Sequence, residues 1–138
     1  MLIEINTTGT LPIYEQLRNQ IVLGIASKRL MPGEALPSVR RLAADLGINF
    51  HTVNKAYTML QDEGYIVVDR RKGALVAHDI TGSEMFHAGL MQKLTLASAE
   101  AICRGMDEKE FAELCVGRYR MAQGDVSVSK SQNRARKA

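Results

Sequence analysis

The chain has 138 residues, of which 46% are hydrophobic and 24% charged, and its formal net charge is +3. These values are typical of a soluble globular protein with one ordinary domain and a small appendage. No apolar run approaches the roughly 18 residues that a membrane-spanning helix needs, and the first residues lack the cationic start and apolar block of a signal peptide. We therefore expect a cytoplasmic protein.

Charge and cysteine content exclude few functions by themselves. Lys and Arg outnumber Asp and Glu by nine to eight up to residue 79 and by nine to seven after it, so nucleic-acid binding must be argued from where the cations lie. The cysteines, Cys103 and Cys115, are too far apart for a CxxC pair and have no neighbouring His that would complete a metal site. We predict that both are buried apolar thiols on helices, with redox or metal chemistry as the alternative, and we expect no metal and no cofactor.

The spacing of apolar residues predicts three helices in the first half of the chain. The first spans residues 11–29, with Pro12 in its first turn, and is amphipathic. The second begins after the N-cap Ser38 and stops at Gly47. The third is capped by Asn49 and ends at Gly64, and its inward face is predicted to be Val53, Ala56, Tyr57 and Leu60.

A hairpin with a cationic tip is predicted directly after the third helix. Residues 65–69 and 74–78 are rich in β-formers, and the four residues between them are Arg70, Arg71, Lys72 and Gly73. Two helices joined around a glycine form a helix-turn-helix, and a basic hairpin after them makes the winged version, which binds duplex DNA. The expected fold class is therefore mainly α with a small β-hairpin, followed by a two-helix carboxy-terminal segment.

The character of the chain changes after residue 79. A short hinge at residues 80–82 precedes one helix over residues 83–104, and Asp107 with Glu110 forms a capping box that starts the last helix. Residues 124–138 lack a periodic apolar face and are predicted to be a disordered basic tail. We expect three regions: a winged helix-turn-helix at 1–79, a helical dimerisation segment at 80–123, and the tail at 124–138.

Two amphipathic helices without a core of their own must bury their apolar stripe against something. A partner subunit is the economical choice, and a two-fold pair would match two half-sites about one helical turn apart. The alternative is that the helices pack only on their own winged helix. The predicted dimer interface consists of Met85, Leu90, Leu94, Ile102, Phe111 and Leu114.

Three groups of residues are candidates for DNA contacts. The start of the third helix should present polar groups to base edges, where Asn pairs with adenine and Lys reaches guanine or phosphate. Ser38 and Arg40, at the start of the second helix, suit a phosphate. The tip residues Arg70, Arg71, Lys72 and Gly73 can follow a strand or enter the minor groove. The candidate positions at the start of the third helix are Asn49, Phe50, His51, Thr52, Asn54 and Lys55. Taken singly, each of these residues could instead belong to an ordinary solvated helix face.

Residues 12–77, nearly half of the chain, resemble the winged-helix domain of the GntR family of bacterial transcription regulators. The resemblance rests on the combined pattern LPSxRxLAxxLGxxxxTVxKAYxxLxxEGYI. It implies a homodimer on a palindromic double-stranded DNA operator. It also implies DNA contacts by Arg40, Thr52 and Asn54, with the Lys72-Gly73 tip reaching the minor groove.

The sequence departs from the common GntR pattern at the start of the third helix and in the wing. Phe50 stands where many members have Arg or Pro, and His51 stands where Thr or Asn is usual. Both departures bear on base preference. In the wing, Ala74 and Leu75 replace the more usual Thr-Phe pair, which should affect packing more than contact.

About 45 structured residues follow the wing, too few for the larger effector-binding domains of the family. This short helical segment resembles the YtrA-type subfamily, in which the helix pair serves dimerisation and whose members often control transporter operons. We therefore expect a homodimeric repressor that acts on a palindromic operator, for instance that of a transporter operon and its own gene. Repressor is preferred over activator because a compact dimer on a promoter blocks polymerase without further contacts.

Two other classes of function are alternatives to a DNA-binding regulator. An enzyme is disfavoured because no Ser/His/Asp set, phosphate loop or carboxylate pair at a pocket-like spacing occurs, and the chain ends before any aminotransferase-like domain. A winged helix reused for protein or RNA contact is the main alternative. Regulation by a small-molecule effector stays an open alternative, since the sequence shows no convergent polar residues that would form a binding pocket for one.

Overall fold

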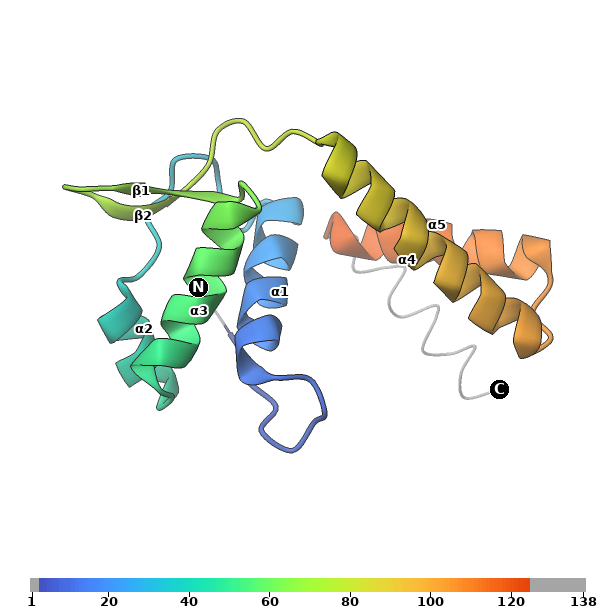
Figure 1. Cartoon of the computed structure of the whole chain (residues 1–138), viewed down its shortest axis with the longest axis horizontal. Coiled ribbons are helices and arrows are strands. Elements are labelled where there is room, and N and C mark those ends of the chain that lie inside the picture. The colour runs from blue at the N-terminus through green and yellow to red at the C-terminus, as the bar shows by residue number, and fades with distance from the viewer. Residues whose placement is uncertain (1–2, 125–138) are drawn as a thin grey trace. The chain divides into compact units, whose positions relative to one another are not determined.

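The computed structural model describes residues 3–124 of the chain, which divides into two units, Met1–Ile80 and Thr81–Ala138 (Figure 1). The first unit contains α1 (Ile13–Ala26), α2 (Val39–Leu46), α3 (Phe50–Asp62), β1 (Ile66–Asp69) and β2 (Gly73–Val76). The second unit contains α4 (Glu84–Cys103) and α5 (Glu108–Ala122). The predicted fold class, mainly α with one β-hairpin and two further helices, is confirmed. The tail predicted for residues 124–138 lies, beyond Gly124, outside the described residues.

The first unit has an aliphatic core to which all three helices and the hairpin contribute. Leu17 and Ile21 of α1 are fully buried, and Ile66 and Val76 close the core from the two strands. The predicted inward face of α3 is confirmed, because Val53, Ala56, Tyr57 and Leu60 are all buried. Each fully buried aliphatic side chain contributes about 1.5–3 kcal/mol through removal of apolar surface from water. One face of α3 is thus fixed in the core, and the opposite face remains in solvent.

Caps and one glycine set the angle between α2 and α3. The Ser38 hydroxyl accepts a hydrogen bond from the Arg41 backbone N–H at 3.1 Å, and Asn49 Oδ1 accepts one from the His51 N–H at 2.8 Å. Gly47 adopts φ +65°, a left-handed conformation that a side chain would disfavour. All three were predicted in these roles, and together they leave only Gly47 and Ile48 between α2 and the α3 cap.

The hairpin is antiparallel, with Ile66 opposite Val76 and Asp69 opposite Gly73. The segment before α2 runs beside β2: Leu36 N–H donates to the Ala74 carbonyl at 2.8 Å, and Val76 N–H donates to the Glu34 carbonyl at 2.9 Å. These bonds join the base of the wing to the entrance of α2. The strands differ by one or two residues from the predicted runs, since Gly73 pairs in the ladder that we expected to start at Ala74.

The first helix is shorter than predicted. It spans Ile13–Ala26 rather than residues 11–29, and Pro12 is its N-cap with φ −55° and ψ 146° instead of a first-turn residue. Proline has no N–H to donate and its ring fixes φ, so it serves as well before the helix as inside the first turn.

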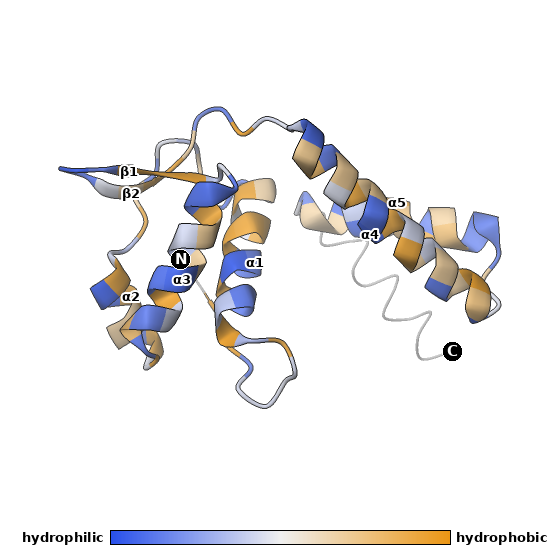
Figure 2. Cartoon of the chain, in the orientation of Figure 1, coloured by the Kyte–Doolittle hydropathy of each residue, from blue (hydrophilic) through white to orange (hydrophobic). Residues whose placement is uncertain are grey.

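The second unit has well-capped helices and, within residues 81–124, no buried core of its own. Ser83 and Asp107 cap α4 and α5 by accepting hydrogen bonds from Phe86 N–H at 3.0 Å and Glu110 N–H at 2.8 Å. No residue of α4 or α5 is buried, although apolar residues occupy much of α4 (Figure 2). The prediction that Cys103 and Cys115 are buried thiols is wrong for the single chain: Cys103 is exposed and Cys115 half-buried, because the helices that carry them enclose no core.

Tyr57 connects α3 to the strand-like segment before α2. Its hydroxyl donates a hydrogen bond to the Pro37 carbonyl oxygen at 2.7 Å, and only 6% of the residue is exposed. Burial raises the pKa of Tyr57 to about 12, because the charged phenolate would lose its hydration. The neutral hydroxyl therefore holds α3 against the entrance of α2 across the whole range in which the protein is expected to work.

Replacing Tyr57 tests this connection. Tyr57→Phe should lower the free energy of unfolding at neutral pH by about 1 kcal/mol, since the partly buried Pro37 carbonyl loses its donor. The folded-state pKa is raised above the ordinary value of 10.0, so the wild type should lose stability as the pH rises from 10 to about 12. The variant should lose less over this interval. Urea unfolding at several pH values measures both effects.

Tyr119→Phe is the matched control, because Tyr119 is 69% exposed on α5. Equal stability losses for the two variants would contradict the role assigned to the Tyr57 hydroxyl.

Candidate nucleic-acid interface

The exposed side of α3 carries four polar residues in one line. Asn54, Lys55 and Thr58 lie three, four and seven residues after His51, which places all four on one face of a helix. All four are exposed, and they lie opposite the buried face described above. We call them the α3 stripe. Thr58 was missed by the sequence analysis, which considered only the first turns of the helix; its spacing of seven from His51 was the signal that could have found it.

The other candidates on α3 lie at its start. Asn49 is exposed, and because its Oδ1 caps the helix, its side-chain NH₂ keeps two free donors. Phe50 is 42% exposed and meets the His51 ring edge-on, with ring centroids 5.7 Å apart and an interplanar angle of 83°. Thr52 is half-buried at the side of the stripe. The unusual Phe50-His51 pair therefore forms one aromatic cluster at the amino end of α3.

Lys55 differs from the other stripe residues because it reaches another helix. Its Nζ lies 3.9 Å from the centroid of the Tyr14 ring on α1, a distance at which a cation is attracted by the negative face of an aromatic ring. Tyr14 is half-buried and packs against the core. The sequence analysis treated Tyr14 only as an apolar position of an amphipathic helix, and no sequence signal linked it to Lys55.

The amino end of α2 offers donors for an anion. Ser38 caps the helix with its hydroxyl oxygen and keeps its own O–H proton free to donate. Arg40 is exposed, and within residues 3–124 no ion pair engages it. Its neighbour Arg41 instead pairs with Asp45 one turn later, at 3.9 Å. The structure thus leaves Arg40, and not Arg41, uncompensated at this helix end.

The wing tip is an ordered cationic turn. Asp69 Oδ1 accepts hydrogen bonds from Arg71 N–H at 2.7 Å and Lys72 N–H at 3.0 Å, and Gly73 closes the turn with φ +78°. The backbone bonds from Lys72 and Arg71 hold the pKa of Asp69 below its ordinary value. Arg70, Arg71 and Lys72 are exposed, and no ion pair in the described part of the chain involves their side chains.

An ion pair joins the carboxy-terminal end of α3 to α1. Arg18 on α1 forms a bidentate pair with Glu63 at the C-cap of α3, and its guanidinium also lies 5.5 Å from the centroid of the Tyr65 ring. The hydrogen bond to Glu63 raises the pKa of Arg18. This pair joins the same two helices that the Lys55–Tyr14 contact joins, but it involves the opposite end of α3.

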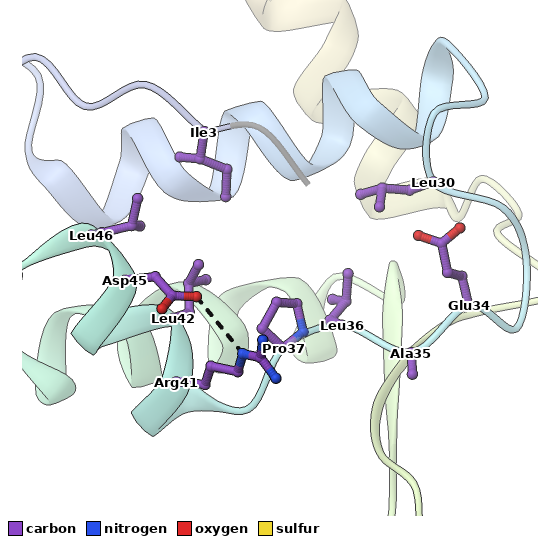
Figure 3. Close-up of a pocket in the computed structure, with 10 residues that line it drawn as sticks. All are labelled: Ile3, Leu30, Glu34, Ala35, Leu36, Pro37, Arg41, Leu42, Asp45 and Leu46. Atoms are coloured by element: carbon purple, nitrogen blue, oxygen red, sulfur yellow. Dashed lines mark ion pairs between the residues drawn. The ribbon is translucent and has the colours of Figure 1, made fainter.

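A groove of about 530 Å³ lies between the amino-terminal segment at Ile3 and helix α2 (Figure 3). Seven of its ten lining residues are apolar, and two of its three charged residues, Arg41 and Asp45, face each other as an ion pair in Figure 3. The apolar lining residues are Ile3, Leu30, Ala35, Leu36, Pro37, Leu42 and Leu46. The groove continues the core to the surface and gathers no convergent polar groups for a ligand.

Metal sites and membrane spans bear on the class of site. Among the described residues, no three His, Cys, Asp or Glu side chains are arranged to hold a metal ion. Within that same part of the chain, no helix is both long enough and apolar enough to cross a membrane.

Comparison with known proteins decides the family. Residues 11–76 match the model described as bacterial regulatory proteins, gntR family. The HTH-type transcriptional regulator Rv1152 of Mycobacterium tuberculosis is 33% identical over 97 residues, which cover 66% of this chain and 80% of that protein. The chain belongs to the GntR family. It is accordingly a DNA-binding transcription regulator with a winged helix-turn-helix, and not an enzyme.

Two YtrA proteins support the predicted YtrA-type subfamily. The HTH-type transcriptional repressor YtrA of Bacillus subtilis is 37% identical over 78 residues, or 56% of this chain and 60% of that one. The structure of YtrA from Sulfolobus acidocaldarius, a GntR-family transcription factor, has 39% identity and a TM-score of 0.57, and the match covers 70% of this chain and 99% of that one.

Two further structures are similar to this GntR-family chain. A transcriptional antiterminator from Listeria monocytogenes has a TM-score of 0.84 at 29% identity, with 89% of this chain and 93% of that chain covered. The DNA-binding domain of AraR, solved in complex with operator ORX1, has a TM-score of 0.50 at 26% identity, with 56% of this chain and 99% of that chain covered.

Proposed function

We propose that the protein is a homodimeric repressor that binds a palindromic operator through the α3 stripe, the amino end of α2 and the wing tip. The observation that carries this proposal is the α3 stripe, a line of exposed polar side chains on a helix whose opposite face is fixed in the core. The major groove of B-DNA is wide enough to admit such a helix. A similar DNA-binding domain, that of AraR, was solved on operator DNA.

Base recognition is assigned to the first turns of α3. The free amide donors of Asn49, the imidazole of His51 and the amide of Asn54 are exposed and suit acceptors on base edges. Phe50 orients His51 through their edge-on contact and offers apolar surface to a thymine methyl. Thr52 is half-buried, so its exposed part reaches the edge of the groove rather than its floor.

Phosphate contacts are assigned to two cationic regions that flank α3. The Ser38 hydroxyl, the free N–H groups of the first turn and the Arg40 guanidinium all belong to the amino end of α2, and we assign a phosphate to this helix end. At the wing, Arg70, Arg71 and Lys72 extend from a turn that Asp69 holds in shape, and Gly73 permits close approach to the minor groove or its flank. Phosphate contacts of this kind fix register and supply most of the salt-dependent affinity.

Dimerisation is assigned to the second unit. In the single chain Met85 is 85% exposed, Ile102 72% and Leu94 49%, and no residue of α4 or α5 is buried. Leu90 and Leu114 are also exposed, and Phe111 is half-buried. A helix that is apolar on several sides requires burial, and a second copy provides it. A two-fold dimer would then present two α3 helices to a palindromic site.

Repression is the mode of regulation that we propose, and two arguments support it. A dimer seated on a promoter excludes polymerase without any further contact, and the similar YtrA of Bacillus subtilis is named a repressor. We assign the protein to the cytoplasm of a bacterial cell, where operator DNA is available, with a transporter operon and its own gene as targets.

The phosphate contacts can be tested with the full-length protein. A duplex is first selected from a random-sequence pool by the wild type, and we call it the selected duplex. Arg40→Ala combined with Arg71→Ala should weaken its binding by at least about tenfold, because two charged hydrogen bonds are lost. The slope of log affinity against log salt should fall by about 0.9 for each phosphate contact removed. Fluorescence anisotropy at several salt concentrations measures both quantities.

Lys28→Ala combined with Arg29→Ala is the matched control, since it removes the same charge from the turn after α1. If both double variants lose equal affinity, net charge and not the proposed interface would govern binding.

The dimer can be tested at α4. Leu94→Glu should convert a species of about twice the 15.3 kDa chain mass into the monomer, because a charge would be buried at the interface. Sedimentation velocity measures the mass, and circular dichroism should show unchanged helix content. Lys93→Glu, next to it on the same helix, should remain dimeric. A wild type that sediments as a monomer at micromolar concentration would contradict the assignment.

A further inference from the structure

The charged end of Lys55 is displaced from the α3 stripe towards α1. Lys55 lies in the line of His51 and Asn54, yet its Nζ is 3.9 Å from the centroid of the Tyr14 ring. Within the described residues it is the one stripe residue whose side chain contacts an aromatic ring of another helix. Helices α1 and α3 lie side by side in the first unit (Figure 1), so this contact bridges two packed helices.

Tyr14 is itself held firmly. It lies one turn before Leu17, on the face of α1 that packs against the core, and it is half-buried there. Its hydroxyl is 3.4 Å from Glu15 Oε1, so the polar end of the ring has a local partner. The ring face is therefore a fixed surface, and the flexible Lys55 side chain adapts to it.

We propose that Tyr14 is a positioning residue that makes Lys55 a phosphate contact instead of a base reader. The inference rests on the DNA interface proposed above. A lysine that reads a base must extend from the helix axis into the groove, whereas the ring holds this ammonium at the α1 side of the stripe. The groove is bordered there by the sugar-phosphate backbone.

The chemistry of the ammonium suits this task. One side of the –NH₃⁺ group faces the ring, and its remaining N–H donors are free for phosphate oxygens. Lysine acts as a compact point charge, which suits a phosphate and does not need the two-pronged geometry of an arginine on guanine. Placing the side chain before DNA arrives also reduces the conformational entropy lost on binding.

The two roles of a lysine give different signatures in binding experiments. A phosphate contact weakens binding to all sequences by the same factor and lowers the salt slope when it is removed, whereas a base contact changes discrimination between sequences. The probes are therefore the selected duplex and a scrambled duplex of the same composition, each measured with the full-length protein at several salt concentrations.

Lys55→Met should weaken binding to both duplexes by the same factor and lower the salt slope by about 0.9. Tyr14→Leu should weaken binding to both by about two- to five-fold, the range of an exposed cation–π contact. Tyr14→Phe, which keeps the ring, should bind like the wild type. In the Lys55→Met background, Tyr14→Leu should cause no further loss, because a positioning residue has nothing left to position.

Tyr65→Leu is the matched control, because Tyr65 is also half-buried and also lies under a cation, that of Arg18. This variant should leave the salt slope unchanged. The inference is overturned if Tyr14→Leu costs the same affinity with and without Lys55, or if Lys55→Met weakens only the selected duplex.

A second measurement does not depend on whether Tyr14→Leu folds. In the wild type and in Tyr14→Phe, the NMR signals of the Lys55 ε-protons should be shifted upfield by the ring, relative to those of exposed Lys93. Unshifted signals would overturn the inference.

A wild type that selects no duplex would refute the proposed function and this inference together. Selection followed by additive effects of Tyr14→Leu and Lys55→Met would refute only the inference.

Discussion

The burial of one face of α3 is the constraint on which the rest of the first unit depends. Val53, Ala56 and Leu60 have no exposed surface, which fixes the rotation of the helix about its own axis. Since a helix has 3.6 residues per turn, fixing these positions determines that His51, Asn54, Lys55 and Thr58 face solvent. The hydrogen bond from Tyr57 to Pro37 and the ion pair between Arg18 and Glu63 then secure the helix against α2 and α1. Packing of the buried face of α3 thus determines which side chains its opposite face offers to DNA.

The helices of the second unit depend on caps within the single chain and not on burial. Its helices have sound caps, but in the single chain they bury no residue. Capping makes a helix begin at a defined residue and contributes about 1 kcal/mol, whereas most helix stability in proteins comes from burial of an apolar face. The proposed dimer therefore does two things at once: it supplies the missing burial for α4 and α5, and it doubles the DNA interface.

Much of the first unit could be predicted from the sequence, because its signals are local. Ser38, Gly47 and Asn49 cap or break helices through bonds to residues within four positions, and the inward face of α3 follows from helical spacing alone. The shorter α1 and the strand ends were missed by one to three residues because terminal turns depend on tertiary packing. The exposure of Cys103 and the half-exposure of Cys115 were missed because apolar periodicity indicates which face needs burial, not whether one chain can bury it.

The candidate site was predicted as a set of residue types, while its internal contacts were not. Sequence analysis placed Lys55 among the residues that face base edges and Arg40 against a phosphate, without any contact for either side chain within the protein. The structure holds Lys55 over an aromatic ring and leaves Arg40 uncompensated. Tyr14 and Lys55 are 41 positions apart (55 − 14), so no local pattern relates them. The same holds for the bonds between the segment before α2 and the wing, which join residues far apart in the chain.

We propose that a single surface, formed by α3, the amino end of α2 and the wing tip, meets the DNA. Titration of the ¹⁵N-labelled full-length protein with the selected duplex, followed by NMR, tests this proposal most directly. The largest amide shifts are expected within residues 38–41, 49–58 and 69–73. Shifts concentrated in α4 and α5, with α3 unaffected, would contradict it.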